Sequence, residues 1–219
     1  MFYLEIIYVI ICVVIIMINY DKELEKLISN LNGTIPKLLL HSCCAPCSSY
    51  VISYLTNYFD ISIFYYNPNI SPKDEYIKRK KEQIRLINSI PTKNKLDIID
   101  CDYENDIYEK MIKGLENEPE RGNRCTVCFK LRLDTTCRKA KELGYDYFGT
   151  TLTVSPYKNS NLINEIGLSL QDKYNIKYLI SDFKKREGYK KSIELSKKYD
   201  LYRQDFCGCK YSKKAKLFD

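Results

Sequence analysis

Seven of the ten cysteines fall into three tight groups, CCAPC, CTVC and CGC. Their members are Cys43, Cys44, Cys47, Cys125, Cys128, Cys207 and Cys209. Thiolates bind zinc and iron-sulfur clusters, and closely spaced cysteines are typical of such sites. One tetrahedral zinc takes four ligands and would leave three oxidisable thiols unused. The set therefore favours a cluster with a neighbouring mononuclear metal over a single zinc.

The spacing of the cysteines within each group predicts which thiols can serve the same metal centre. Neighbouring side chains of an extended chain point to opposite sides. By this argument the adjacent Cys43 and Cys44, and likewise the CGC thiols, are expected to serve two different centres. The C-x-x-C pair can hold one zinc, one cluster or one disulfide, and by itself stays ambiguous. Cys12 and Cys101 are left out of the site, and Cys137 is expected in the core.

The elements that must position these thiols follow from the hydrophobic pattern. Five apolar runs predict strands, and the stretches between them predict helices. The strands are expected at 37–41, 61–66, 96–100, 147–151 and 176–180, and the helices at 48–57, 72–88, 103–113, 126–143 and 160–174. This alternation predicts an α/β fold with a parallel sheet and helices on both faces. Ligands collect beyond the carboxyl ends of such strands, so the metal site is expected there.

The first cysteine group stands directly after the first predicted strand, in a strand-to-helix turn. Free backbone N–H groups and the helix dipole favour thiolates at such a turn. Pro46 suits the first helical turn, and Ser48 or Ser49 is expected to cap the helix. The polar stretch 114–123, which precedes the CTVC group, is expected to be a loop.

The net charge and the N-terminal segment say less about the function than the cysteines do. The 219 residues carry a formal charge of +7, which fits a phosphate-bearing partner but equally a bias of composition. Residues 1–16 form an apolar leader, expected to lie upstream of a true start at Met17 or to be a short membrane anchor. The segment after Met17 predicts an amphipathic helix. Residues 17–219 are expected to form a single α/β domain.

Several blocks of the chain together resemble the cobalamin-independent epoxyqueuosine reductase family. They read LLLHSCCAPCSSYV, KGLENEPERGNRCTVCFKLRL, DYFGTTLTVSPYKN and ISDFKKREGYKKSIELSKKYDLYRQDFCGC, and span about residues 38–212. The resemblance implies a nucleotide-hydrolase-like (HUP-like) domain in the cytoplasm. It also implies two-electron reduction of the epoxide of epoxyqueuosine, at the wobble position of tRNA, to give queuosine.

The resemblance further implies a 4Fe-4S cluster beside a mononuclear iron. The seven grouped cysteines match the metal-binding cysteines of the family, without showing which holds which iron. Some members have a carboxylate where Cys47 stands, so Cys47 fits the mononuclear iron. The expected partners are tRNA with a queuosine-type wobble base and an unidentified electron donor. DNA is not expected, and membrane contact is expected only if the leader is translated and retained.

Other side chains are candidates for proton transfer and for substrate binding. The proton donors or site-lining residues are Asp182, Tyr157, Tyr202 and Asp205, and the tRNA-binding residues are Lys158, Lys184, Lys185, Arg186 and Arg203. Tyr157, Phe183 and Tyr202 could also stack on a base. The single histidine, His41, is expected to orient the turn, to touch the site or to be a satisfied buried side chain.

Four alternative functions were weighed against a reductase. A structural zinc-binding protein that interacts with RNA and a thiol-disulfide oxidoreductase both remain open. A phosphate-activating enzyme of the same fold would need a Gly-rich loop where CCAPCSS stands. A radical methionine enzyme would need a C-x-x-x-C-x-x-C spacing that the chain lacks.

Overall fold

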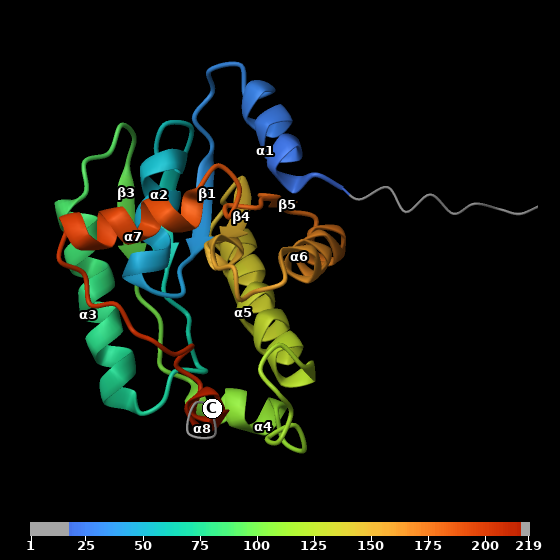
Figure 1. The fold of residues 1–219 in the computed structure, drawn as a ribbon. Helices are drawn as coiled ribbons and strands as arrows, with labels where there is room; N and C mark the ends of the chain where they lie inside the picture. Colours follow the sequence, from blue (N-terminus) through green and yellow to red (C-terminus); the bar gives the residue numbers. More distant parts are fainter. Residues whose placement is uncertain (1–17, 216–219) are drawn as a thin grey trace, which may run out of the picture.

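The fold is an α/β sandwich around a five-stranded parallel sheet (Figure 1). The computed structural model describes residues 18–215, with side chains to 212. The sheet order is β3-β2-β1-β4-β5, and all four pairings are parallel. The strands are β1 (Lys37–His41), β2 (Asp60–Phe64), β3 (Leu96–Ile99), β4 (Tyr147–Thr150) and β5 (Lys177–Tyr178). The predicted α/β class and all five predicted strands are confirmed, with β5 shorter than expected.

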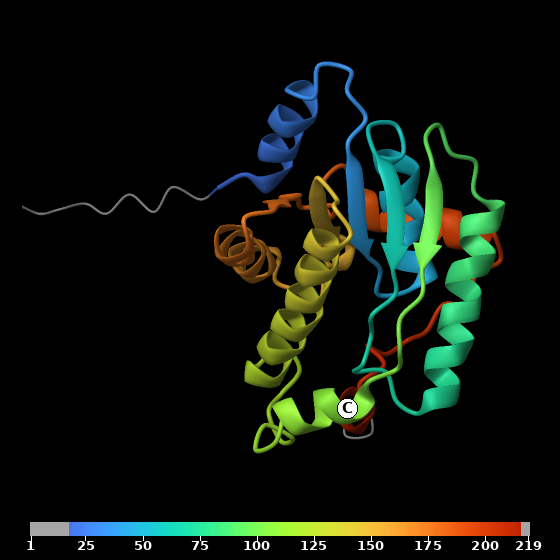
Figure 2. The same cartoon turned by 180° about the vertical axis from the view of Figure 1, so that it is seen from behind.

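Helices cover both faces of the sheet, as Figures 1 and 2 show from opposite sides. They are α1 (Tyr20–Ser29), α2 (Ala45–Leu55), α3 (Lys73–Ser89), α4 (Asn105–Met111), α5 (Asn123–Glu142), the 3-10 turn η1 (Leu152–Val154), α6 (Ser160–Tyr174), α7 (Gly188–Lys198) and α8 (Lys210–Ala215). Side chains alternate along β1, so Leu38 and Leu40 pack with α2 whereas Leu39 packs with α5. All three leucines are fully buried, as expected for a sheet covered on both faces.

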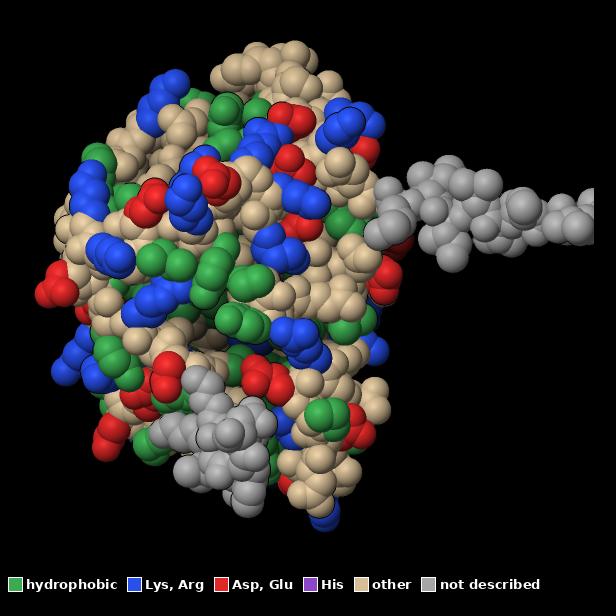
Figure 3. All heavy atoms as spheres, in the orientation of Figure 1, with side chains coloured by type: hydrophobic (Ala, Val, Ile, Leu, Met, Phe, Trp, Pro, Cys, Tyr) green, Lys and Arg blue, Asp and Glu red, His purple; other side chains and the backbone are tan. Residues whose placement is uncertain are grey.

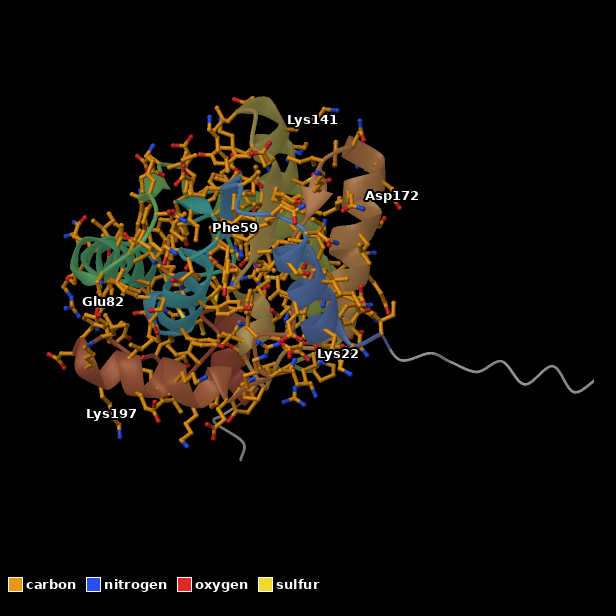
Figure 4. All side chains as sticks on the ribbon, turned by 90° about the horizontal axis from the view of Figure 1, so that it is seen from above. Lys22, Phe59, Glu82, Lys141, Asp172 and Lys197 are labelled. Atoms are coloured by element: carbon orange, nitrogen blue, oxygen red, sulfur yellow. The ribbon has the colours of Figure 1, made fainter. Side chains whose placement is uncertain are left out.

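The packing separates apolar from charged side chains in the way the pattern predicts. Leu133, Cys137 and Ala140, at helical spacing on α5, are all fully buried, so the predicted core role of Cys137 is confirmed. In the view from above, Phe59 lies in the middle of the molecule while Lys141 projects from its helix (Figure 4). The helices thus use one apolar stripe each to cover the sheet.

The strand order creates a crevice at one point of the sheet. The chain builds outward from β1 to β3, then returns through α4 and α5 to place β4 on the other side of β1. The direction of winding therefore reverses between β1 and β4, which is where ligands bind in doubly wound sheets. In Figure 2 the strands point toward α4 and the C-terminal segment, which therefore lie beyond the carboxyl ends of the strands.

Two local expectations about helices were wrong. The helix after β1 begins at Ala45, with Cys44 as its N-cap and no side-chain cap bond. Pro46 lies in the first turn as expected, but Ser48 and Ser49 lie inside the helix, and their hydroxyls donate to carbonyls three residues earlier. The earlier start follows from proline, whose fixed φ and missing N–H suit the first helical turn.

Helix α7 was not predicted, because its buried face is made of small residues. Gly188, Ser192 and Ser196 are its buried positions, at a spacing of four. A hydrophobic pattern cannot reveal such a face. The small side chains let α7 pack closely on α2, and a Cβ atom on Gly188 would lie 2.6 Å from a ring carbon of Tyr50 on α2.

At the N-terminus, α1 confirms the amphipathic helix expected after Met17, and its Leu24 is buried. Within residues 18–215, none of the helices has the length and apolar character needed to cross a bilayer. The predicted leader, 1–16, lies outside the described residues, so its role stays a prediction.

Candidate functional site

The first cysteine group forms a compact trio at the switch point of the sheet. The Sγ atoms of Cys43 and Cys44 are 3.9 Å apart, and those of Cys43, Cys44 and Cys47 all lie within 4.8 Å of one another. Metal–sulfur bonds of about 2.3 Å in a tetrahedral site separate the ligand sulfurs by about 3.8 Å. The trio could therefore hold one metal ion. The expectation that adjacent thiols diverge is wrong here, because the two sulfurs lie 3.9 Å apart although Cys44, the N-cap of α2, has an extended backbone.

The three thiols of the trio differ in pKa. Hydrogen bonds from the thiols of Cys44 and Cys47 lower the pKa of Cys43 well below its usual range, against the effect of burial. The charge of Lys158 and the hydroxyl of Thr151 act in the same direction. The pKa of Cys44 is raised to about 11, mainly by its bond to Cys43, and that of Cys47 is raised as well. Of the three thiols, Cys43 is therefore the one that loses its proton most readily.

The other four grouped cysteines come from two elements. Cys125 and Cys128 lie in the first two turns of α5, and Cys207 and Cys209 lie in the segment before α8. A cavity of about 290 Å³ is lined by all four thiols. The loop 114–122 leads into α5 as predicted, and its Arg121 backbone N–H donates to Cys125 Sγ over 3.3 Å.

The two sets of thiols meet in one cleft. A second cavity, of about 550 Å³, is lined by the trio and by Cys207, so Cys207 belongs to both cavities. Arg132 and Lys158 also line both. The tertiary structure therefore brings seven cysteines from three distant parts of the chain to adjoining cavities.

The C-terminal pair is held in place by α3. Arg79 is 2% exposed, and its Nη1 donates to the carbonyl oxygen of Cys207 over 3.3 Å. Gly208 has a φ of +105°, and a Cβ atom there would lie 2.9 Å from Arg79 Nη1. Only glycine fits this left-handed turn without strain. The backbone turns at Gly208, and side chains two residues apart in an extended chain would in any case lie on the same side, so the expectation of opposite sides is wrong for this pair too.

Two cationic side chains line both cavities at the place where the cavities meet. Arg132 is 2% exposed; its Nε donates to the Cys128 carbonyl over 3.3 Å, and within the described part of the chain its Nη2 has no hydrogen-bond partner. Burial disfavours the charged form of Lys158, but the nearby thiols, above all Cys43, outweigh this and raise its pKa. A buried charge is costly unless it is paired, so this site is built to face negative charge.

His41 is a satisfied buried histidine, one of the three expected roles. Its Nε2 lies 3.1 Å from the carbonyl oxygen of Tyr66 and its Nδ1 lies 2.9 Å from Thr150 Oγ1. The carbonyl can only accept, so Nε2 carries the proton and Nδ1 accepts from the threonine hydroxyl. Burial, reinforced by Arg132, lowers the pKa of His41 to about 3. The neutral ring ties the end of β1 to β4 and to the segment that follows β2.

The structure places the remaining candidates in two groups. Tyr157, Asp205, Lys158 and Arg203 line the larger cavity. The other five line neither cavity: Asp182, Tyr202, Lys184, Lys185 and Arg186. Of these, Asp182 pairs with Lys184 at 3.1 Å, the Tyr202 hydroxyl donates to Glu75 over 3.1 Å, and Arg186 pairs with Asp21 at 3.0 Å.

Sequence reasoning missed several cavity-lining residues, among them Tyr108, Arg121 and Arg132. Arg132 follows Cys128 by four residues on α5, so helical spacing could have placed it one turn from a thiol. No comparable signal marks Tyr108, whose approach to Cys209 depends on the packing of distant elements.

Figure 3 shows Lys and Arg side chains surrounding apolar side chains on the face that carries α7.

The sheet, its switch point and the thiol-lined cleft define an α/β protein with a cysteine trio that could hold a metal. The family model described as epoxyqueuosine reductase QueH matches residues 38–215. The chain belongs to this family of oxidoreductases, which confirms the resemblance seen in the sequence.

Curated relatives support the assignment over most of the chain. An epoxyqueuosine reductase QueH of Staphylococcus epidermidis is 50% identical over 201 residues, which cover 89% of this chain and 84% of the relative. That of Streptococcus pyogenes is 45% identical, with coverage of 92% and 81%. That of Thermotoga maritima is 34% identical, with coverage of 80% and 89%.

Proposed function

We propose that this chain reduces epoxyqueuosine at the wobble position of tRNA to queuosine. The epoxide becomes an alkene by uptake of two electrons and two protons, and its oxygen leaves as water. The observation that carries the proposal is the convergence of seven thiols on two adjoining cavities. Membership of the QueH family supports the same reaction.

The two sets of thiols fit two different metal groups. The close sulfurs of Cys43, Cys44 and Cys47 suit a mononuclear iron, with a position left open for substrate. Cys125, Cys128, Cys207 and Cys209 provide the four thiolates that a 4Fe-4S cluster takes. The unpartnered Nη2 of Arg132 fits the negative charge that such a set would carry. When bound, the cluster would supply single electrons and the iron would act as a Lewis acid on the epoxide oxygen.

The chain's own residues prepare the cleft for C–O cleavage. Arg132 and Lys158 present positive charge where the two cavities meet, so they stabilise the negative charge that develops on the epoxide oxygen. Arginine keeps its proton at any working pH, so it acts as a fixed hydrogen-bond donor. Tyr157 and Asp205 line the larger cavity and are the proposed proton donors.

The mouth of the cleft suits an unstacked nucleoside with its phosphates. Tyr157 is 61% exposed, and the Arg121 guanidinium lies 5.8 Å from its ring centroid. Arg203, over the ring of Tyr189 at 5.4 Å, lines the same cavity. Aromatic rings stack on splayed bases, and arginines neutralise the backbone of single-stranded RNA. Lys184, Lys185 and Arg186 lie outside the cavities and would contact more distant parts of the tRNA.

The proposed setting is the cytoplasm, with an electron donor still to be identified. All nine cysteines of the described residues are free thiols. Unpaired cysteines in this number fit a reducing compartment, where disulfides are rare.

The test begins with iron, acid-labile sulfide and zinc per chain in protein purified and reconstituted without oxygen. The expected content is about four sulfide and about five iron. Incubation with epoxyqueuosine-containing tRNA and a chemical reductant should then yield queuosine, measured by mass spectrometry of the digested nucleosides. Zinc without sulfide after reconstitution would overturn the proposal in favour of a structural zinc protein. A metal-free protein with a reactive C-x-x-C would favour a thiol-disulfide oxidoreductase.

A further inference from the structure

Tyr108 is a buried phenol aimed at one of the proposed cluster ligands. It lies on α4, is 1% exposed, and lines the smaller cavity. Its Oη is 3.2 Å from the Sγ of Cys209, 101 residues further along the chain. Among the described residues, it is the only side chain with a hydrogen bond to a thiol of Cys125, Cys128, Cys207 or Cys209.

The chemistry of the pair sets the direction of this bond. A metal-bound cysteine is a thiolate, which has no proton and can only accept. The phenol of Tyr108 carries an O–H group, which is the donor that such a sulfur needs, and its Oη lies within hydrogen-bonding distance of the Sγ. Tyr108 therefore donates O–H···S to Cys209 when that sulfur is a ligand.

Such a bond stabilises one oxidation state over the other. One-electron reduction adds negative charge to the cluster and its sulfurs, and an O–H donor interacts more strongly with the more negative form. Hydrogen bonds to the sulfurs are among the factors that set cluster potentials. Because Tyr108 is shielded from water, this hydrogen bond is not weakened by competition from solvent donors.

We infer that Tyr108 is a positioning residue that raises the reduction potential of the cluster through its hydrogen bond to Cys209. The inference rests on the proposed function, because it requires the four-cysteine set to hold a 4Fe-4S cluster. It adds a role for a residue of α4, an element that contributes none of the thiols.

The experiment compares cluster midpoint potentials in anaerobic, dye-mediated titrations followed by visible and electron paramagnetic resonance spectra. Tyr108→Phe removes only the hydroxyl, and its midpoint should shift to a more negative value than that of the wild type. Replacement of Tyr108 by 3-fluorotyrosine, a more acidic phenol and stronger donor, should shift the midpoint in the positive direction. The matched control is Tyr103→Phe, whose hydroxyl donates to the Ile70 carbonyl over 2.6 Å and lines neither cavity. This control should keep the wild-type potential.

Each result is decisive. A Tyr108→Phe protein with full sulfide content and the wild-type midpoint would overturn the inference. A Tyr108→Phe protein that assembles no cluster would also overturn it, because the hydroxyl would then serve assembly and not potential. A wild-type protein without labile sulfide would instead overturn the proposed function, so the two failures are distinguishable.

Discussion

The two thiol sets of the cleft are built in different ways. The trio Cys43, Cys44 and Cys47 comes from five consecutive residues at one strand-to-helix turn, and its sulfurs already lie within 4.8 Å of one another. The set of Cys125, Cys128, Cys207 and Cys209 comes from two elements about eighty residues apart. It depends on α3 to hold the C-terminal pair in place.

This difference separates a local site from a tertiary one. The geometry of the trio follows from β1 and α2, both anchored in the core. The geometry of the second set follows from the docking of the segment before α8. Perturbations far from the thiols should therefore affect the second set more than the trio.

The largest expected effect is on the second set itself. Cys125→Ala should abolish cluster assembly and turnover, because a 4Fe-4S cluster needs its thiolate ligands. The measurements are labile sulfide, the visible spectrum and the tRNA reduction assay. Cys137→Ala is the control, since this side chain is buried in the apolar core, where its Sγ donates to the Leu170 carbonyl over 3.8 Å. It should cost about 1 kcal/mol of unfolding free energy and leave the sulfide in place. An unchanged spectrum in Cys125→Ala would refute the ligand assignment.

Removal of one thiol from the trio should have a narrower effect. Cys47→Ala should lower the iron content from about five to about four per chain while sulfide stays at about four. Turnover should fall about 10²- to 10³-fold, because a Lewis acid contributes several kcal/mol to cleavage. Cys47→Asp, which keeps an anionic ligand, should retain the iron. Loss of sulfide along with the iron in Cys47→Ala would show that the two sets form one centre.

Arg132→Gln tests the role of the positive charge where the two cavities meet. Removing a preorganised donor to a developing oxyanion typically costs on the order of 10²-fold in kcat. We expect that loss with little change in tRNA affinity and full sulfide content. Arg138→Gln, on the same helix but paired with Asp134 at the surface, is the matched control and should keep wild-type turnover. Equal losses in both variants would assign the effect to the helix and not to the cleft.

The dependence of the second set on docking is tested at the CGC turn. Gly208→Ala places a side chain at a φ of +105° and close to Arg79, so it should cost about 2 kcal/mol and lower sulfide retention. The trio should keep its iron. Gly144→Ala also has a positive φ, +68°, but open space around its Cβ, so it should lose stability without losing sulfide. Thermal unfolding and sulfide content measure both effects; retained sulfide in Gly208→Ala would argue against the tertiary origin of the set.

The smallest expected effect lies at the mouth of the cleft. Arg203→Ala should weaken tRNA binding by about 1 kcal/mol and flatten the salt dependence by about 0.7 in log–log slope, the value for one phosphate contact on a single strand. Binding titrations at several salt concentrations measure both quantities. Lys185→Ala, an exposed residue outside the cavities, should change affinity less. Identical slopes for Arg203→Ala and the wild type would exclude a phosphate contact.

Much of the framework was predictable from the sequence, because local patterns report on burial. The five strands, the C-x-x-C pair at the head of α5 and the core position of Cys137 were all predicted correctly. Helix α7 was not, since its buried face of Gly188, Ser192 and Ser196 carries no apolar stripe. The divergence expected for Cys43 and Cys44 was also wrong, because it was argued from strand alternation alone. Cys44 is extended, yet its Sγ lies 3.9 Å from that of Cys43.

The fold class, the family and the seven grouped cysteines could all be recognised from the amino-acid sequence. Spacing along the chain and apolar periodicity are properties of short segments, and both can be read without coordinates. Tertiary packing determines which thiols share a cavity, which charges face them and that Tyr108 reaches Cys209. These contacts join elements far apart in the sequence. They depend on the reversal of winding between β1 and β4, because the loops that follow the strands of both halves of the sheet meet at one crevice there.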